Sequence, residues 1–275
     1  MLWWLACTTD DGKHPIPPGE RPPLDSGDAD TDSDTDADTD SDTDADTDSD
    51  TDSDTDTDNL DPPLGETSGG SGGADAPRGT SLTTGRTSYG LIAPTGSASG
   101  SALPLLIVIS GVEGGDAMLS NMAQVAPYFG LEDALIAVLD GTTARAADGA
   151  AVLDAVRADF DVDNDRTWLL SESAGTAAGL ALAFDERPTW FAAYWANDVN
   201  AADTPAMTAD ELGFAPWGNA GPGGDLPDAR TIVNGMSAAG WQLPSDAPYS
   251  ADGGDTHGST DQFLAAVEFF PDKQR

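Results

Sequence analysis

Residues 168–179 read WLLSESAGTAAG, and this stretch determines which fold we expect for the chain. A short apolar run, typical of a buried strand, stops at polar residues, and an alanine-rich helical pattern then begins. Ser173 lies between the two, flanked by small residues on a tight strand-to-helix turn. Such a turn raises a hydroxyl above the end of a sheet, so the sequence predicts that Ser173 is a nucleophile.

A serine nucleophile needs a base to accept its proton, and histidine is the usual choice. The chain has two histidines, and of these only His257 follows Ser173 in sequence that has a folded composition. His257 lies in the triplet Thr256-His257-Gly258, just before an expected terminal helix. We therefore take His257 as the candidate general base.

Strands and helices are expected to alternate from about residue 86 onward. Repeated β-α-β units of this length predict an α/β fold, a mostly parallel sheet with helices on both faces. The expected strands are 89–94, 103–109, 134–139, 167–170 and 190–195, and the expected helices are 118–129, 150–160, 174–184, 229–239 and 260–270.

Four segments (86–94, 103–115, 161–179 and 256–270) make the chain resemble the polyhydroxybutyrate depolymerase and feruloyl esterase branch of the α/β-hydrolases. The Glu-Ser-Ala-Gly core is also similar to that of carboxylesterases. The resemblance implies a serine esterase that cleaves carboxylic esters, either small or polymeric, through a cofactor-free acyl-enzyme mechanism. A metal centre is not expected, because one histidine and no cysteine leave only carboxylates as ligands in this part of the chain.

The resemblance assigns roles to particular positions. Ser173 would attack the acyl carbon, and His257 would remove its proton. The backbone amides of Ala174 and Val112 would form the oxyanion hole. Two departures stand out: Ser171 replaces the first glycine of the Gly-x-Ser-x-Gly motif, and Glu113 brings a carboxylate near the oxyanion loop.

The acid of the triad is the open assignment. The family pattern Gly-x-x-Asp corresponds to residues 218–221, where the acid position is Gly221. Asp225, just downstream, is our first choice, and Asp198, just past the strand expected at 190–195, is the alternative. The remaining candidates are Asp228, Asp246 and Asp255.

The sequence before this domain has a different composition. Residues 28–58 carry aspartate at every even position, with no apolar face to bury, so this tract is expected to be disordered. A Gly/Ser/Pro-rich linker follows, and we expect residues 8–85 as a disordered stalk and 86–275 as the hydrolase domain. The net charge of −38 makes nucleic acid a poor partner.

Residues 1–7 read MLWWLAC and resemble the end of a bacterial lipoprotein signal peptide, in which Cys7 would carry the lipid. Cys7 is the only cysteine, so a disulfide framework is excluded. The resemblance implies an enzyme anchored at the bacterial surface, touching the membrane only through that lipid, or alternatively a secreted one.

Two other interpretations remain open at the level of sequence. The domain could be a catalytically inactive, hydrolase-like binding module, because the oxyanion loop and the acid depart from the family pattern. Function could also lie in the aspartate tract as a cation-binding polymer. The sequence decides neither the oligomeric state nor the acyl and alcohol groups of the substrate.

Overall fold

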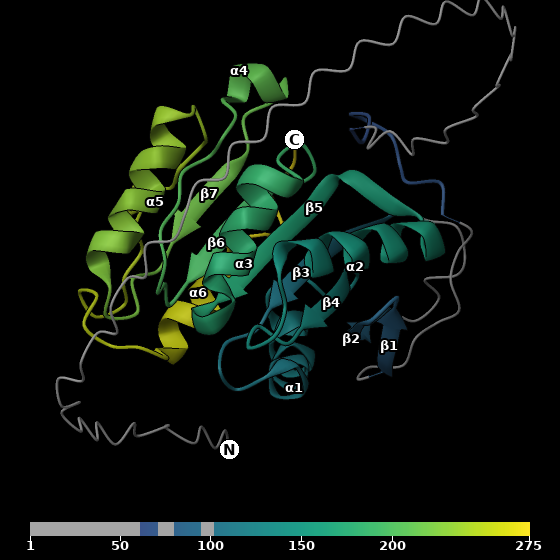
Figure 1. Cartoon of the computed structure of the whole chain (residues 1–275), viewed down its shortest axis with the longest axis horizontal. Coiled ribbons are helices and arrows are strands. Elements are labelled where there is room, and N and C mark those ends of the chain that lie inside the picture. The colour runs from purple at the N-terminus through teal and green to yellow at the C-terminus, as the bar shows by residue number, and fades with distance from the viewer. Residues whose placement is uncertain (1–60, 71–79, 95–101) are drawn as a thin grey trace, which may run out of the picture. The chain divides into compact units, whose positions relative to one another are not determined.

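One seven-stranded sheet, in the order β1-β2-β4-β3-β5-β6-β7, crosses the part of the chain that the structure describes (Figure 1). The structure is a computed structural model, and it describes residues 61–70, 80–94 and 102–275. The strands are β1 Thr80–Thr84, β2 Thr87–Ile92, β3 Leu103–Ile109, β4 Leu135–Leu139, β5 Val162–Glu172, β6 Ala193–Asn197 and β7 Trp217–Ala220.

The sheet is parallel from β4 across to β7, and β1 and β2 join it in antiparallel pairs. Residues Leu105–Ile109 of β3 are fully buried, as expected of a strand covered on both faces. The register aligns Ile109 with Ser171 of β5, and Glu172 with Asn197 of β6. The carboxyl ends of these neighbouring strands therefore meet at one edge of the sheet, where open α/β sheets bind their ligands.

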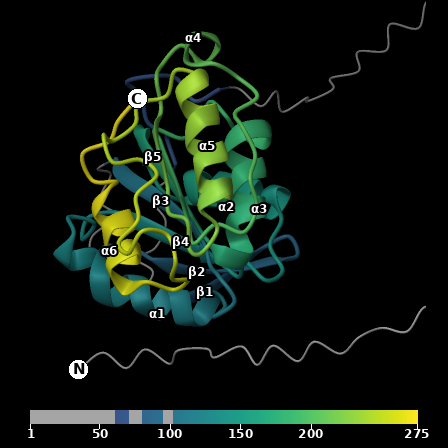
Figure 2. The same ribbon diagram turned by 90° about the vertical axis from the view of Figure 1, so that its left-hand side faces the viewer.

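Helices cover both faces of the sheet (Figure 2). Helices α1 and α6 pack on one face, and α2, α3 and α5 pack on the other, which gives two separate hydrophobic clusters. None of the helices in the described ranges is long and apolar enough to cross a membrane. The helices are α1 Gly115–Val125, η2 Ala126–Tyr128, α2 Ala146–Asp159, η3 Ser173–Gly175, α3 Thr176–Ala181, η4 Leu182–Glu186, α4 Ala209–Leu212, α5 Leu226–Ala238 and α6 Thr260–Glu268.

The folded unit starts earlier than the sequence predicted. Strand β1 ends at Thr84, before the expected domain boundary at residue 86, and pairs with β2 along its whole length. Residues 61–70, expected as part of a disordered stalk, also pack against the domain, within a compact unit that spans 59–275. The expectations for residues 1–60, including the aspartate tract and Cys7, lie outside the described residues.

Several elements differ in detail from those expected, and two of these differences bear on the site. The strand expected at 190–195 is β6, Ala193–Asn197, so Asp198 follows its last residue directly. The helix expected at 174–184 is divided into η3, α3 and the π-helical turn η4. The short elements β7 and α4 were not expected at all.

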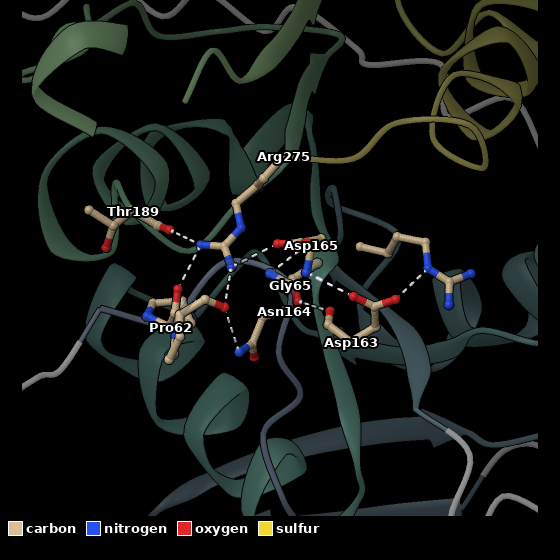
Figure 3. A network of polar contacts seen from close by, with 10 residues as sticks. Pro62, Gly65, Asp163, Asn164, Asp165, Thr189 and Arg275 are labelled. Carbon is tan, nitrogen blue, oxygen red and sulfur yellow. Dashed lines mark hydrogen bonds and ion pairs between the residues drawn. The ribbon is translucent and has the colours of Figure 1, made fainter. Parts of the chain in front are cut away.

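Arg275 holds the segment 61–70 against the sheet (Figure 3). Its side chain is 1% exposed, and its Nη1 atom donates to the carbonyl oxygens of Pro62 at 3.1 Å and Thr189 at 2.9 Å. Its Nη2 atom lies 3.3 Å from the Asp165 carboxylate, which also accepts the Gly65 amide at 2.9 Å. The guanidinium therefore joins the segment to the first half of β5.

We expect Arg275→Met to lower the free energy of unfolding by about 2–4 kcal/mol, because it removes a charged donor from several buried acceptors. Urea denaturation followed by tryptophan fluorescence measures the change. The matched control is Arg230→Met, since Arg230 is exposed on α5 and its replacement should change stability by less than about 0.5 kcal/mol. Equal effects of the two substitutions would contradict the proposed role of Arg275.

Candidate active site

Ser173 lies on a strained turn directly after β5. Its φ of +46° is in the left-handed region, which is unfavourable for a residue with a side chain. The turn is held by close backbone packing: a Cβ at Gly175 would lie 2.6 Å from the carbonyl oxygen of Ser110 and 2.8 Å from that of Ile109. Strain of this kind persists only where the surroundings impose it, and such residues cluster at functional sites.

Ser171, which stands where the related motif has glycine, is accommodated by a buried hydrogen bond. Its hydroxyl lies 2.9 Å from the hydroxyl of Tyr194 on β6. Burial raises the pKa of Tyr194, so this phenol stays protonated and can donate. Helix α3 passes close to the same point, because a Cβ at Gly179 would collide with the Ser171 side chain. A serine is therefore compatible with the turn, provided that residue 179 is glycine.

The structure brings Ser173 and His257 together. The Ser173 hydroxyl oxygen lies 2.8 Å from Nε2 of His257, and the other ring nitrogen, Nδ1, lies 3.0 Å from the carbonyl oxygen of Gly223. When Nδ1–H donates to that carbonyl, Nε2 has a free lone pair that accepts the serine proton. Ser173 is 6% exposed and His257 is exposed, so solvent reaches the pair from the histidine side.

Asp198 contacts the loop that carries His257. It follows β6, is fully buried, and has a φ of +46°, like Ser173. These two are the only non-glycine residues with positive φ in the described ranges. One Asp198 oxygen accepts the amide of Gly258, the residue after His257, and the other accepts Nε2–H of Gln262 at 2.7 Å.

The position where the family pattern carries its acid has no room for a side chain. A Cβ at Gly221 would lie 2.6 Å from Oδ1 of Asn197 and 2.7 Å from Nε2 of Gln262. The Gln262 amide that fills this space is the same group that binds Asp198. The Gln262 side chain therefore links the two observations: it occupies the space that an acid after β7 would need, and it hydrogen-bonds the buried carboxyl group after β6.

Asp225, the first choice from sequence, does not reach His257. It is the N-cap of α5, where its carboxylate accepts the amide of Asp228 at 3.3 Å. An aspartate before a Leu-Pro helix start is typical of this capping role. Within the described ranges no carboxylate accepts a hydrogen bond from the His257 ring, which excludes direct contact for Asp228, Asp246 and Asp255 as well.

The loop after β3 lies against Ser173. A Cβ at Gly111 would be 3.2 Å from Cβ of Ser173, so this loop touches the turn. Among the described residues, no acceptor takes the amide hydrogen of Val112 or Ala174, the two expected oxyanion donors. The Glu113 carboxylate folds back to accept the Gly111 amide at 2.9 Å, which keeps its negative charge near this site.

Glu113 also lines a cavity of about 440 Å³. Tyr89 of β2, Asp116 of α1 and Asp140 after β4 also line it, but Ser173 and His257 do not. Three carboxylates at its walls make this a poor place for an anionic group.

Sequence reasoning missed the residues that support the site rather than form it. These are Glu172, Asn197, Gly223 and Gln262. Only Glu172 had a signal in the sequence, because it precedes the nucleophile. The other three lie far apart along the chain and meet only in the fold.

No family model matches the chain, and no curated protein matches it by sequence. Solved structures, in contrast, share its architecture. A thermostable esterase aligns with a TM-score of 0.52 at 15% identity over 71% of this chain; the chain spans 62% of that protein. A ferulic acid esterase from the fungus Anaeromyces mucronatus aligns with a TM-score of 0.50 at 10% identity, over 70% of this chain and 88% of that one.

A thermophilic carboxylesterase cloned from a metagenomic library also aligns, with a TM-score of 0.50 at 14% identity, over 76% of this chain and 88% of that one. The fold is that of the α/β-hydrolases. Such distant likeness establishes the α/β-hydrolase fold alone, so the activity must be argued from the residues of the site.

Proposed function

We propose that this protein is a serine esterase that cleaves carboxylic esters through an acyl-enzyme intermediate. One observation carries the proposal: the Ser173 hydroxyl lies 2.8 Å from Nε2 of His257, on a backbone turn held in the left-handed region. A nucleophile within hydrogen-bond reach of its base is the geometry that acyl transfer requires.

In the proposed reaction, His257 takes the Ser173 proton as the hydroxyl oxygen attacks the acyl carbon. The amides of Ala174 and Val112 stabilise the oxyanion. His257 then protonates the leaving alcohol. In the second half of the reaction, His257 takes a proton from water, the water oxygen attacks the acyl carbon, and His257 returns the proton to Ser173 as the acid is released. We assign no cofactor to these steps.

We further propose that Asp198 is the acid of this site, acting in an unusual way. The Gly223 carbonyl selects the histidine tautomer, as a triad carboxylate ordinarily would. Asp198 holds the backbone of the histidine loop through Gly258 and places a negative charge near the ring, where an imidazolium forms during attack. Orientation and charge compensation are thus divided between two groups.

We expect Ser173→Ala and His257→Ala each to lower kcat for a short p-nitrophenyl ester by roughly 10⁴-fold or more, since the pair acts as a unit. Circular dichroism verifies that the variants fold, and Ser237→Ala, at an exposed serine on α5, is the control that retains activity.

A fluorophosphonate probe tests the same assignment against the alternative of an inactive binding domain. Labelling of the wild-type protein, and its loss in Ser173→Ala, supports the esterase. An unlabelled wild-type protein would favour the binding domain, for which the carboxylate of Glu113 beside the oxyanion loop is the motivating observation.

Glu113→Gln should raise kcat by up to about tenfold, because the carboxylate opposes the negative charge that develops on the oxyanion. The amide oxygen of glutamine still accepts the Gly111 amide, so the loop keeps its hydrogen bond. Asp116→Asn is the matched control, since Asp116 lines the cavity without that bond. A fall in kcat on Glu113→Gln would show that the negative charge is needed.

We propose that the enzyme is displayed at the cell surface through a lipid on Cys7, with secretion as the alternative. The support is the sequence of residues 1–7 and the aspartate tract that follows them. Metabolic labelling with an alkyne fatty acid in a bacterial host should mark the wild-type protein and not Cys7→Ser. Equal labelling of both would exclude this anchor.

A further inference from the structure

Glu172 is a buried carboxyl group that the proposed mechanism leaves without a role. It is the last residue of β5, directly before Ser173, and it is 8% exposed. An isolated carboxylate in such a place is strongly unfavourable unless it is paired or protonated. Its partners therefore decide what it does.

The Glu172 side chain lies against two consecutive residues at the end of β6, Asn197 and Asp198. Nδ2 of Asn197 donates to Oε2 of Glu172 at 2.7 Å. The orientation of that amide is fixed, because its Oδ1 accepts the indole N–H of Trp195 at 3.1 Å. Asp198 is the next residue after Asn197, and its carboxyl group lies beside that of Glu172, so that a proton on one can be donated to the other.

A hydrogen bond between two carboxyl groups requires one proton, so one of the two must be neutral. The donors around the pair indicate which one. Asp198 accepts the Gly258 amide and the Gln262 amide group, one on each oxygen, whereas Glu172 accepts only Asn197. More hydrogen-bond donors stabilise a negative charge on Asp198 than on Glu172. We therefore assign the proton to Glu172.

We propose that Glu172 is a positioning residue: as a neutral carboxylic acid it donates a hydrogen bond to Asp198 and holds that carboxylate, charged, against the His257 loop. This inference rests on the proposed function, because it gives Glu172 a part in the same site. Glu172 itself touches neither the substrate nor the reacting atoms.

The charges that face Glu172 agree with this assignment. Burial raises its pKa well above the ordinary value, and the neighbouring charges of Asp198 and of Glu113 raise it further. Burial also raises the pKa of Asp198, but a hydrogen bond from Glu172, the Gly258 amide and a protonated His257 oppose that rise, while Asp252 adds to it. All of these groups except His257 are acids, so they favour keeping one proton on the Glu172–Asp198 pair.

The decisive test compares reciprocal substitutions in the full-length enzyme, assayed with p-nitrophenyl acetate. Glu172→Leu should lower kcat/KM by about 10–100-fold, an effect like that of losing a residue that orients a metal ligand. Glu172→Gln should restore most of this loss, since its amide both accepts from Asn197 and donates to Asp198. Asp198→Asn should lower kcat/KM by about 10³-fold or more, because the charge itself is removed.

The dependence on pH separates a positioning role from a merely structural one. In the wild-type enzyme, kcat/KM should fall at high pH, where Glu172 loses its proton and two carboxylates repel each other. Glu172→Gln cannot lose a proton there, so this fall should disappear. The inference is wrong if Glu172→Gln is as inactive as Asp198→Asn, or if Asp198→Asn retains activity, because the charge would then reside on Glu172.

Thermal stability tests the proton without any assay of activity. A pKa raised in the folded state gives stability that is complete below the unfolded value, near 4.5 for glutamate, and is lost as pH rises toward the folded pKa. The Tm of Glu172→Gln minus the Tm of the wild type should therefore increase steadily as pH rises from about 4.5. Glu268→Gln, at an exposed site on α6, should keep a constant difference from the wild type.

A constant difference for Glu172→Gln as well would overturn the assignment of the proton to Glu172. If the wild-type protein hydrolyses no ester, the proposed function fails. The comparison of Tm values against pH then still decides where the proton of the Glu172–Asp198 pair lies.

Discussion

The close backbone packing of three loops at the carboxyl edge of the sheet is the constraint on which the site depends. The loops after β3, β4 and β5 approach so closely that a Cβ at Gly141 would lie 2.9 Å from the backbone of Gly175. Glycine at these two positions lets the chain turn sharply after Glu172, and the turn forces Ser173 into the left-handed region. The position of the Ser173 hydroxyl is thus set by contacts between main chains.

The fold could be predicted where apolar runs are continuous, and it was missed where they are not. The predicted limits of β3, 103–109, are confirmed, because an unbroken run of large apolar residues is buried on both faces. Strand β7 reads WGNA and β1 reads TSLTT, and neither has a pattern that distinguishes it from a loop. Their conformation comes from pairing with β6 and β2, which is information held elsewhere in the chain.

The site divides in the same way. Ser173 could be proposed because it lies between a strand pattern and a helix pattern, and His257 because histidine is rare in this chain. The acid could not, because every candidate was one of many aspartates, and the choice depends on backbone that meets only in three dimensions. Asp225 is followed by a helix start and caps it, whereas the features that favour Asp198 are a strained φ, burial and the filled space beside Gly221.

The attachment of residues 61–70 has a mechanical consequence. This segment binds the first residues of β5 through the Ser68 amide to the Val162 carbonyl, at 2.8 Å, and through Arg275. Ser173 lies at the opposite end of the same strand, about 35 Å away for eleven extended residues. A pulling force on the chain before residue 61 would therefore act on the first residues of β5, at the end opposite Ser173. The neighbouring strands would share that force before it reached Ser173.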